Sequence, residues 1–79
     1  MPNPESASAV SSTVCSTRNA SLDSLLNQVA QCQANAEFLA QLGFVLNTQG
    51  RYAEALDHLE RALMLNPGLK GARIDYAVA

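Results

Sequence analysis

The sequence predicts an all-α fold built from antiparallel helix pairs, and two observations carry this prediction. From Leu22 onward, apolar residues recur every three or four positions, which is the period of an amphipathic helix. Two such segments lie on either side of Gly50, and the second stops at Pro67 and Gly68, where helices commonly end. No stretch alternates apolar and polar residues as a half-buried strand does. With 79 residues, the chain has room for one small domain.

Residues 1–20 differ in composition from the rest of the chain. They are dominated by Ser, Thr, Ala, Pro and Asn, and they contain few large apolar side chains. Such a segment cannot bury enough apolar area to offset its ordering entropy, so we expect a flexible leader. It is interpreted either as a domain-boundary tail or as a tether. The helical domain is expected over residues 21–79.

Four helices are expected in this domain, and three of them have clear end signals. Ser21 is a suitable N-cap for the first helix, and Asp23 places a negative charge where the helix dipole favours it. Gly50 follows the second helix, where a left-handed residue is wanted, and Pro67 ends the third. The fourth helix runs to the last residue without a stop signal. The expected helices span residues 21–34, 36–49, 52–65 and 70–79.

The outer face of the third helix carries two pairs of ionisable side chains at a spacing of four. These pairs are Asp57 with Arg61 and Glu54 with His58. Residues at this spacing are neighbours on a helix surface, so we expect both pairs to interact weakly. His58 is expected to be a solvated surface histidine.

The second and third helices form a repeat-sized unit in which small residues stand at defined places. Gly43 and Ala55 are small where the two helices should cross, and Ala62 is small where a further helix should pack. In mid-helix Gly43 costs roughly 1 kcal/mol relative to Ala, so close packing is the expected compensation. Tyr52 is expected to pack near the turn. The whole pattern comprises Leu39, Leu42, Gly43, Leu46, Gly50, Tyr52, Ala55, Leu59, Ala62 and Pro67.

This pattern resembles the tetratricopeptide repeat (TPR) family over one complete repeat, Ala36 to Leu69. Leu39 and Leu46 replace the large aromatic residues that the family often has on its first helix. Residues 71–79 are similar to the start of a second repeat, and residues 21–34 to the second half of a degenerate preceding one. The resemblance implies a right-handed solenoid of helix pairs, here one complete repeat with partial neighbours.

The resemblance also implies a binding face, because the first helix of each TPR pair lines the concave side of the array. Some TPR domains grip a peptide carboxylate with a Lys, Asn and Arg clamp, but Ala40 and Phe44 stand where the first Lys and the Asn would be. We therefore expect a groove for an apolar helix or extended peptide, or a surface covered by the N-terminal helix or by a dimer mate. The residues expected on this face are Glu37, Gln41, Phe44, Asn47, Thr48, Ile74, Asp75 and Val78.

Repeat proteins bury their core by stacking, and one repeat with partial neighbours leaves faces to be covered. Two interpretations follow. The chain is a fragment of a longer array, or the isolated chain forms a homodimer in which the C-terminal helices pair or exchange.

Cys15 and Cys32 are the two cysteines of the chain. They are too few for a structural zinc site, so no metal is expected. They are interpreted either as free thiols or as a disulfide formed in an oxidising compartment. If a helix starts at Ser21, Cys32 lies about 17 Å along its axis, and the six residues from Cys15 to Ser21 span about 20 Å when extended. A bond therefore requires the leader to double back along the helix, nearly taut.

Charge and residue content exclude several classes of function. The net charge is −2, from five Lys and Arg against seven Asp and Glu, and no basic stripe is present for nucleic acid. No segment has the roughly twenty continuous apolar residues of a membrane-spanning helix. His58 is the only histidine, and no nucleophile, base and orienting group are expected to converge around it. We expect neither an enzyme nor a bound cofactor.

The predicted function is protein–protein interaction, with a protein or peptide as partner. An alternative follows from the register of residues 37–67 and 72–79, which is similar to TPR segments of bacterial outer-membrane export and assembly proteins. That alternative implies a periplasmic location, whereas a TPR adaptor would be cytoplasmic, and the sequence favours neither.

Overall fold

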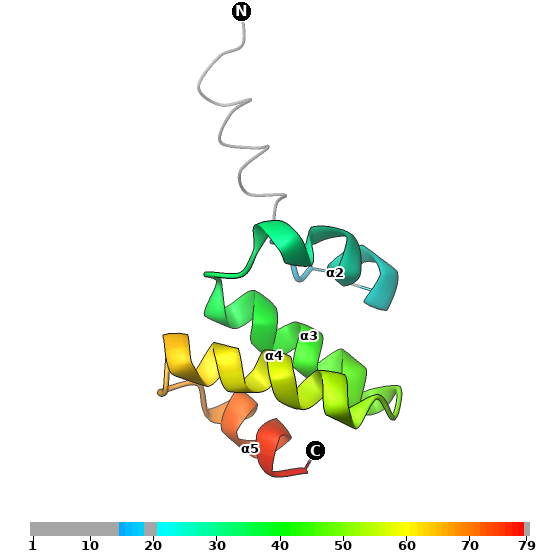
Figure 1. The fold of residues 1–79 in the computed structure, drawn as a ribbon. Helices are drawn as coiled ribbons and strands as arrows, with labels where there is room; N and C mark the ends of the chain where they lie inside the picture. The colour runs from blue at the N-terminus through cyan, green and yellow to red at the C-terminus, as the bar shows by residue number, and fades with distance from the viewer. Residues whose placement is uncertain (1–14, 19–20, 79) are drawn as a thin grey trace, which may run out of the picture.

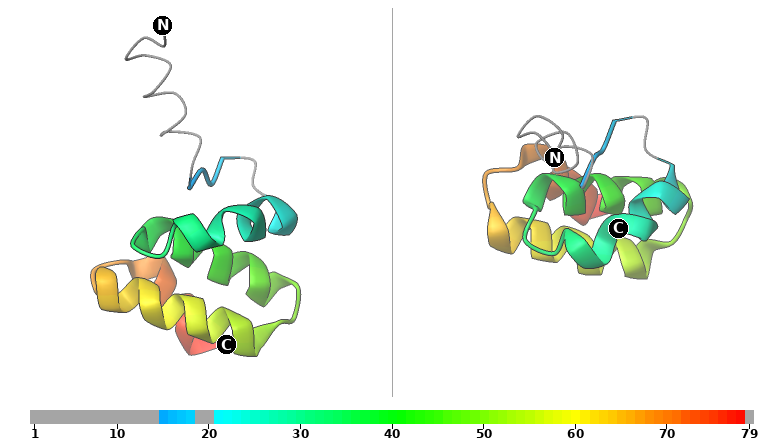
Figure 2. Two further views of the ribbon diagram at one scale, coloured as in Figure 1. Left: turned by 45° about the horizontal axis from the view of Figure 1, so that its top comes forward. Right: turned by 90° about the horizontal axis from the view of Figure 1, so that it is seen from above.

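The computed structural model describes residues 15–18 and 21–78, and all regular structure in these residues is helical. Helices α3 and α4 lie side by side and antiparallel, α2 packs against α3, and α5 packs across both members of the pair (Figures 1 and 2). The prediction of an all-α fold is confirmed. The elements are α2 (Leu22–Gln28), a 3-10 turn η1 (Val29–Gln31), α3 (Ala36–Thr48), α4 (Tyr52–Leu65) and α5 (Lys70–Val78).

The core lies mainly between α3 and α4, which approach each other closely at Gly43. A Cβ built on Gly43 would stand only 2.6 Å from Cδ2 of Leu59, a separation that real Cβ atoms do not show. The absence of a side chain therefore lets the two helices approach each other closely. The buried apolar residues around this contact are Leu25, Cys32, Phe38, Leu39, Leu42, Leu46, Ala55, Leu59, Ala62 and Ala72.

Gly50 makes the turn between α3 and α4. Its φ is +77°, in the left-handed region that glycine adopts without steric cost. The N–H of Gly50 donates to the carbonyl of Asn47 at 3.0 Å, and the N–H of Arg51 donates to that of Leu46 at 2.9 Å. These two bonds form a Schellman motif, which satisfies carbonyls that the end of α3 would otherwise leave unpaired.

Asn66 and Pro67 connect α4 to α5. The N–H of Asn66 donates to the carbonyl of Ala62 at 2.8 Å, and the side-chain Oδ1 of Asn66 accepts from the N–H of Gly68 at 3.0 Å. Pro67 has no N–H with which to continue the helix. The chain therefore reverses here and brings α5 back onto the pair.

The first helix is shorter than the expected range 21–34. Ser21 caps it as predicted, its Oγ accepting from the N–H of Ser24 at 3.2 Å, but α2 ends at Gln28 and only the η1 turn follows. The carbonyl of Val29 accepts from the N–H of Cys32 at 3.1 Å and from Nε2 of Gln33 at 2.8 Å. These competing donors tighten the last turn and lead the chain into the next helix, and sequence periodicity does not reveal such competition.

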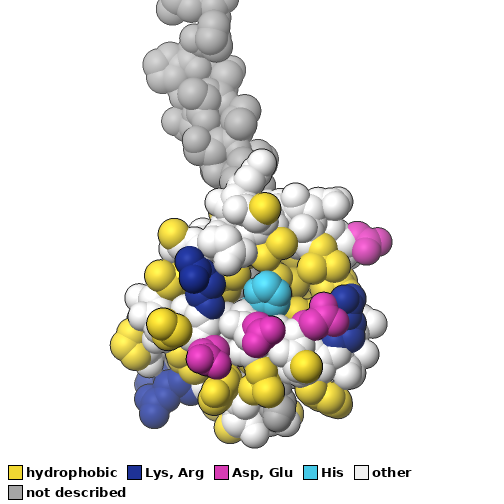
Figure 3. Space-filling view, viewed as in Figure 1, with side chains coloured by type: hydrophobic (Ala, Val, Ile, Leu, Met, Phe, Trp, Pro, Cys, Tyr) yellow, Lys and Arg dark blue, Asp and Glu magenta, His cyan; other side chains and the backbone are white. Residues whose placement is uncertain are grey.

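The charged side chains on the surface of α4 have partners other than those predicted. Both oxygens of Glu54 accept from Arg51 at 2.7 Å, and the interaction of Glu54 with His58 is electrostatic, without a hydrogen bond between the two described side chains. Nε of Arg61 donates to the carbonyl of Gln33 at 2.6 Å, so Arg61 links α4 to the chain before α3 instead of pairing with Asp57. Figure 3 shows this face, with acidic side chains and the single histidine set among apolar ones.

Tyr52 begins α4 next to the hairpin turn, and 52% of its surface is exposed. The expected leader, residues 1–20, lies mostly outside the described residues, as does Ala79 at the end of the expected fourth helix. In the described part of the chain, no helix combines the length and apolarity needed to cross a membrane.

Candidate partner-binding groove

A hollow of about 330 Å³ lies between α3 and α5. The two helices present to it an apolar floor with polar side chains beside it. We call this hollow the α3–α5 groove, and its lining residues are Glu37, Ala40, Gln41, Phe44, Leu69, Gly71, Ala72 and Asp75.

The apolar part of the groove centres on Phe44. Of the other apolar lining residues, Ala72 is buried, and Ala40 and Leu69 are half-buried, whereas Phe44 is 46% exposed. Phe44 follows Gly43 on α3. The residue that permits the close approach of α4 is therefore adjacent in sequence to the residue that lines the groove. An aromatic ring left half in solvent beside small apolar residues can accept an apolar side chain from outside.

Two carboxylates flank this apolar surface, one from each helix. Glu37 lies in the first turn of α3, where the helix N-terminus favours a negative charge. Asp75 lies on α5 and is half-buried, and this burial raises its pKa because a charged carboxylate loses solvation there. The groove therefore combines apolar area with negative charge.

Asn47 fixes the position of α5 relative to α3. Its Nδ2 donates to the backbone carbonyl of Asp75 at 3.0 Å, a bond between residues 28 positions apart in sequence. This donation also sets the orientation of the amide, so Oδ1 of Asn47 is the atom that is buried without a hydrogen-bond partner in the structure. The contact helps to shape the groove without occupying it.

The structure places the eight residues expected on the binding face in different positions. Glu37, Gln41, Phe44 and Asp75 line the groove together, and Asn47 holds α5 behind it. Thr48 does not line it, and its Oγ1 donates to the carbonyl of Val45 at 2.7 Å within the last turn of α3.

Ile74 and Val78 also lie outside the groove, with 65% and 69% of their surfaces exposed. Ile74 lines a separate hollow on α5 with Lys70, Arg73 and Ala77. Two residues along an α-helix differ by about 200° around its axis, so Ile74 cannot share a face with Ala72. The roll of α5 about its own axis decides this placement.

Ala40, which the sequence places on the binding face at the position of the absent clamp, also lines the groove. Three further lining residues were not predicted from the sequence, namely Leu69, Gly71 and Ala72. A helical spacing could have indicated two of them, because Gly71 and Ala72 stand four and three positions before Asp75 and so share its face. Leu69 precedes the helix and carries no such signal.

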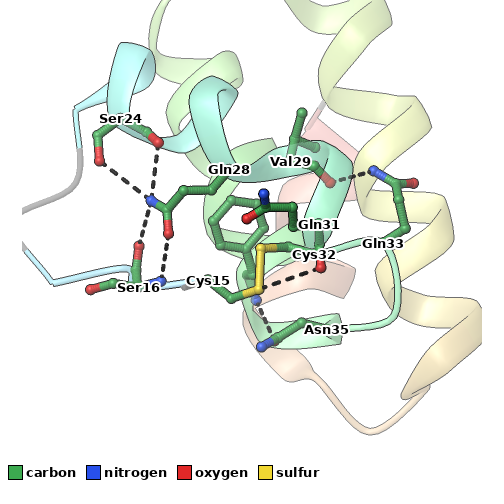
Figure 4. The surroundings of a disulfide bond; sticks show 10 residues. Cys15, Ser16, Ser24, Gln28, Val29, Gln31, Cys32, Gln33 and Asn35 are labelled. Atoms are coloured by element: carbon green, nitrogen blue, oxygen red, sulfur yellow. Dashed lines mark hydrogen bonds between the residues drawn. A yellow bond between two sulfur atoms is a disulfide. The ribbon is translucent and has the colours of Figure 1, made fainter. Parts of the chain in front are cut away.

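Cys15 and Cys32 are joined by a disulfide at the N-terminal side of the molecule, with their Cα atoms 5.6 Å apart (Figure 4). Cys32 is buried in the core, whereas Cys15 lies in the segment that precedes α2. The side chain of Gln28 ties the same segment to α2, since its Oε1 accepts from the N–H of Ser16 at 3.0 Å. Its Nε2 donates to the carbonyl of Ser24 at 3.0 Å. The segment thus doubles back along α2 and is held there by a covalent bond and by hydrogen bonds.

The described residues offer no constellation for metal binding, because no three His, Cys, Asp or Glu side chains among them converge. His58 is half-buried on α4. Burial lowers its pKa, while the neighbouring Asp57 and Glu54 act in the opposite direction. Its surroundings are those of a surface histidine covered in part by neighbouring side chains.

The family model of the tetratricopeptide repeat matches residues 36–69. These residues are a tetratricopeptide repeat. The match runs from the start of α3 to the residue before α5, so the TPR consists of the α3–α4 hairpin and the turn that follows it. TPRs are typically protein–protein interaction modules, so the match suggests such a module in this part of the chain. No curated protein and no solved structure has a significant match to the chain.

Proposed function

We propose that this chain is a protein–protein interaction module whose α3–α5 groove binds a peptide or helix of a partner protein. The observation that carries the proposal is the half-exposed Phe44 in a groove between the first helix of the TPR and the helix that follows the repeat. Helix α2 packs against α3 and contributes no lining residue, so the N-terminal helix does not cover the groove. Among the described residues, only α3, α5 and the turn before α5 line the groove, which supports its availability to a partner.

A selection from random peptides tests this proposal without assuming a partner. A phage-displayed library of random peptides about twelve residues long is selected on the full chain and, in parallel, on Phe44→Asp. We expect peptides that bind the wild-type chain and are lost on Phe44→Asp, because a charge in the apolar floor opposes burial of an apolar side chain.

Met64→Asp is the matched control, since Met64 is 78% exposed on α4 and does not line the groove. Circular dichroism should show both variants folded. Selected peptides that bind wild type, Phe44→Asp and Met64→Asp equally well, or a selection that enriches nothing, would refute the proposal.

A second surface supports self-association as a further function. Ile74 and Val78 stand four positions apart on α5, are largely exposed, and therefore present neighbouring apolar side chains to solvent. We propose that this face packs against a second copy or against a neighbouring repeat. Sedimentation over a range of concentrations should show a homodimer that Ile74→Asp weakens, and a chain that is monomeric at millimolar concentration would contradict the homodimer.

The disulfide supports an oxidising compartment, because cytosolic thiols are kept reduced. This supports the alternative of a periplasmic TPR segment of a bacterial export or assembly protein over a cytoplasmic adaptor. Rapid acid quenching of cells followed by alkylation and mass spectrometry measures the thiol state. Alkylated Cys15 and Cys32 would argue against export.

A further inference from the structure

We infer that the partner segment bound in the α3–α5 groove is cationic, with a Lys or Arg side chain beside an apolar one. This inference rests on the proposed function, since it specifies which peptide the groove accepts. Its basis is the charge of the lining. Glu37 and Asp75 contribute two carboxylates, and no cationic side chain stands among the lining residues.

No Lys or Arg side chain neutralises these two carboxylates in the part of the chain that the structure describes. All five of its cationic residues lie in the described part of the structure. Arg51 pairs with Glu54, and Arg61 donates to the carbonyl of Gln33. Lys70 and Arg73 line the separate hollow with Ile74, and Arg18 precedes α2. None of the five forms an ion pair with Glu37 or Asp75 among the described residues.

The surroundings of Asp75 make a cation more favourable there than at an open surface. Burial raises the pKa of Asp75 because its charged form has lost part of its hydration. An ammonium or guanidinium group placed beside it would compensate for that loss and lower the pKa again. A ligand carboxylate or phosphate would instead add a like charge to two existing ones.

The apolar lining residues of the groove indicate the second feature of the ligand, an apolar side chain. Glu37 and Phe44 are seven residues apart on α3, so about 10 Å separates them along the helix axis. An extended peptide covers this distance in about three residues, and a helical peptide in about two turns. A ligand with a cationic residue near Glu37 and an apolar residue near Phe44 therefore matches the length of the groove.

The selected peptides provide the first test. Those that depend on Phe44 should be enriched in Lys and Arg and depleted in Asp and Glu relative to the library. Three acetylated and amidated versions of one selected peptide, with Lys, Gln or Glu at the cationic positions, provide the second. The Lys version should bind most tightly and the Glu version least, with up to about fivefold lost for each charge pair removed. High salt should reduce the advantage of the Lys version.

Two substitutions remove the carboxylates without changing side-chain size, Glu37→Gln and Asp75→Asn. Each should weaken binding of the Lys version by up to about fivefold and leave the Gln version nearly unchanged. Asp57→Asn is the control, because Asp57 is exposed on α4 and does not line the groove. Glu37 is exposed, so Glu37→Gln keeps the test valid even if Asp75→Asn perturbs the fold.

The outcomes separate this inference from the proposed function. Phe44-dependent peptides without excess positive charge, or equal affinity for the Lys and Gln versions, would overturn the inference and leave the groove as a binding site. A preference for the Glu version or for an RNA oligonucleotide would overturn it as well. A selection with no Phe44-dependent peptide would overturn the proposed function and this inference with it.

Discussion

At the scale of single residues, Gly43 shows how one missing side chain sets a helix–helix distance. Gly43→Ala gains about 1 kcal/mol of helix propensity, but overpacking of a dense core costs typically 1–3 kcal/mol. The new Cβ would overlap Leu59 near its branch point, which is less able to move than the end of a flexible chain. We expect the overlap to dominate and the free energy of unfolding to fall, as measured by urea denaturation.

Gly71→Ala is the control for this prediction. Gly71 lies in α5, and a Cβ there would meet no heavy atom within 4 Å. Only the propensity gain should operate, so this variant should be more stable than wild type by up to about 1 kcal/mol. If Gly43→Ala were stabilised by the same amount, the close approach of α3 and α4 would not be limiting.

The lowered pKa of His58 predicts how the free energy of unfolding depends on pH between about 5 and 7. Its pKa is lowered in the folded chain, so the unfolded chain binds more protons in this interval and stability rises with pH. Asp75, whose pKa is raised, has the opposite effect on the pH dependence of stability. That effect occurs in a lower pH interval, near the ordinary range of carboxyl groups. Thermal melts of wild type should shift upward as pH rises from 5 to 7, and His58→Gln should flatten this change. An unchanged slope would exclude His58 as its source.

At the scale of elements, the segment before α2 and the 3-10 turn are held together by the disulfide. The bridge closes a loop with a sequence separation of 17, for which the chain-entropy model gives a stabilisation of about 3 kcal/mol. Cys15→Ser should lower the free energy of unfolding by about that amount, and reduced wild type should behave alike. Cys15 is the better position to replace, because a hydroxyl at the buried Cys32 would add its own cost. Equal stability of oxidised and reduced wild type would show that the bridge contributes nothing.

The ends of the helices differ in how well the sequence predicts them. The ends of α3 and α4 were predictable because Gly50 and Pro67 act through local backbone chemistry. The early end of α2 was not, because it depends on side-chain donors that compete for the carbonyl of Val29. The position of Ile74 was not predictable either, because the roll of α5 is set by its contacts with α3 and α4.

At the scale of the whole molecule, the α3–α4 hairpin lies between two helices, α2 and α5, that are held to it in different ways. Helix α2 is secured on one side by the disulfide that joins Cys32 to the preceding segment. Helix α5 packs on both helices of the hairpin without a disulfide, and it exposes Ile74 and Val78. The core of the repeat was predictable from the sequence because its residues have the spacing typical of a TPR. The groove was less predictable, because it depends on how α5 packs against that core.

The bond between Asn47 and α5 has a consequence for how this groove could change its specificity. Asn47 bonds to the backbone carbonyl of residue 75, so the anchor would persist whatever side chain that position carries. Substitution there could alter the selectivity of the module while its geometry stays fixed. Asp75→Lys should thus shift preference from basic to acidic peptides without unfolding the chain, a comparison that fluorescence anisotropy with the Lys and Glu peptides can make. Positions anchored through main-chain atoms are where a repeat can acquire new ligands at little structural cost.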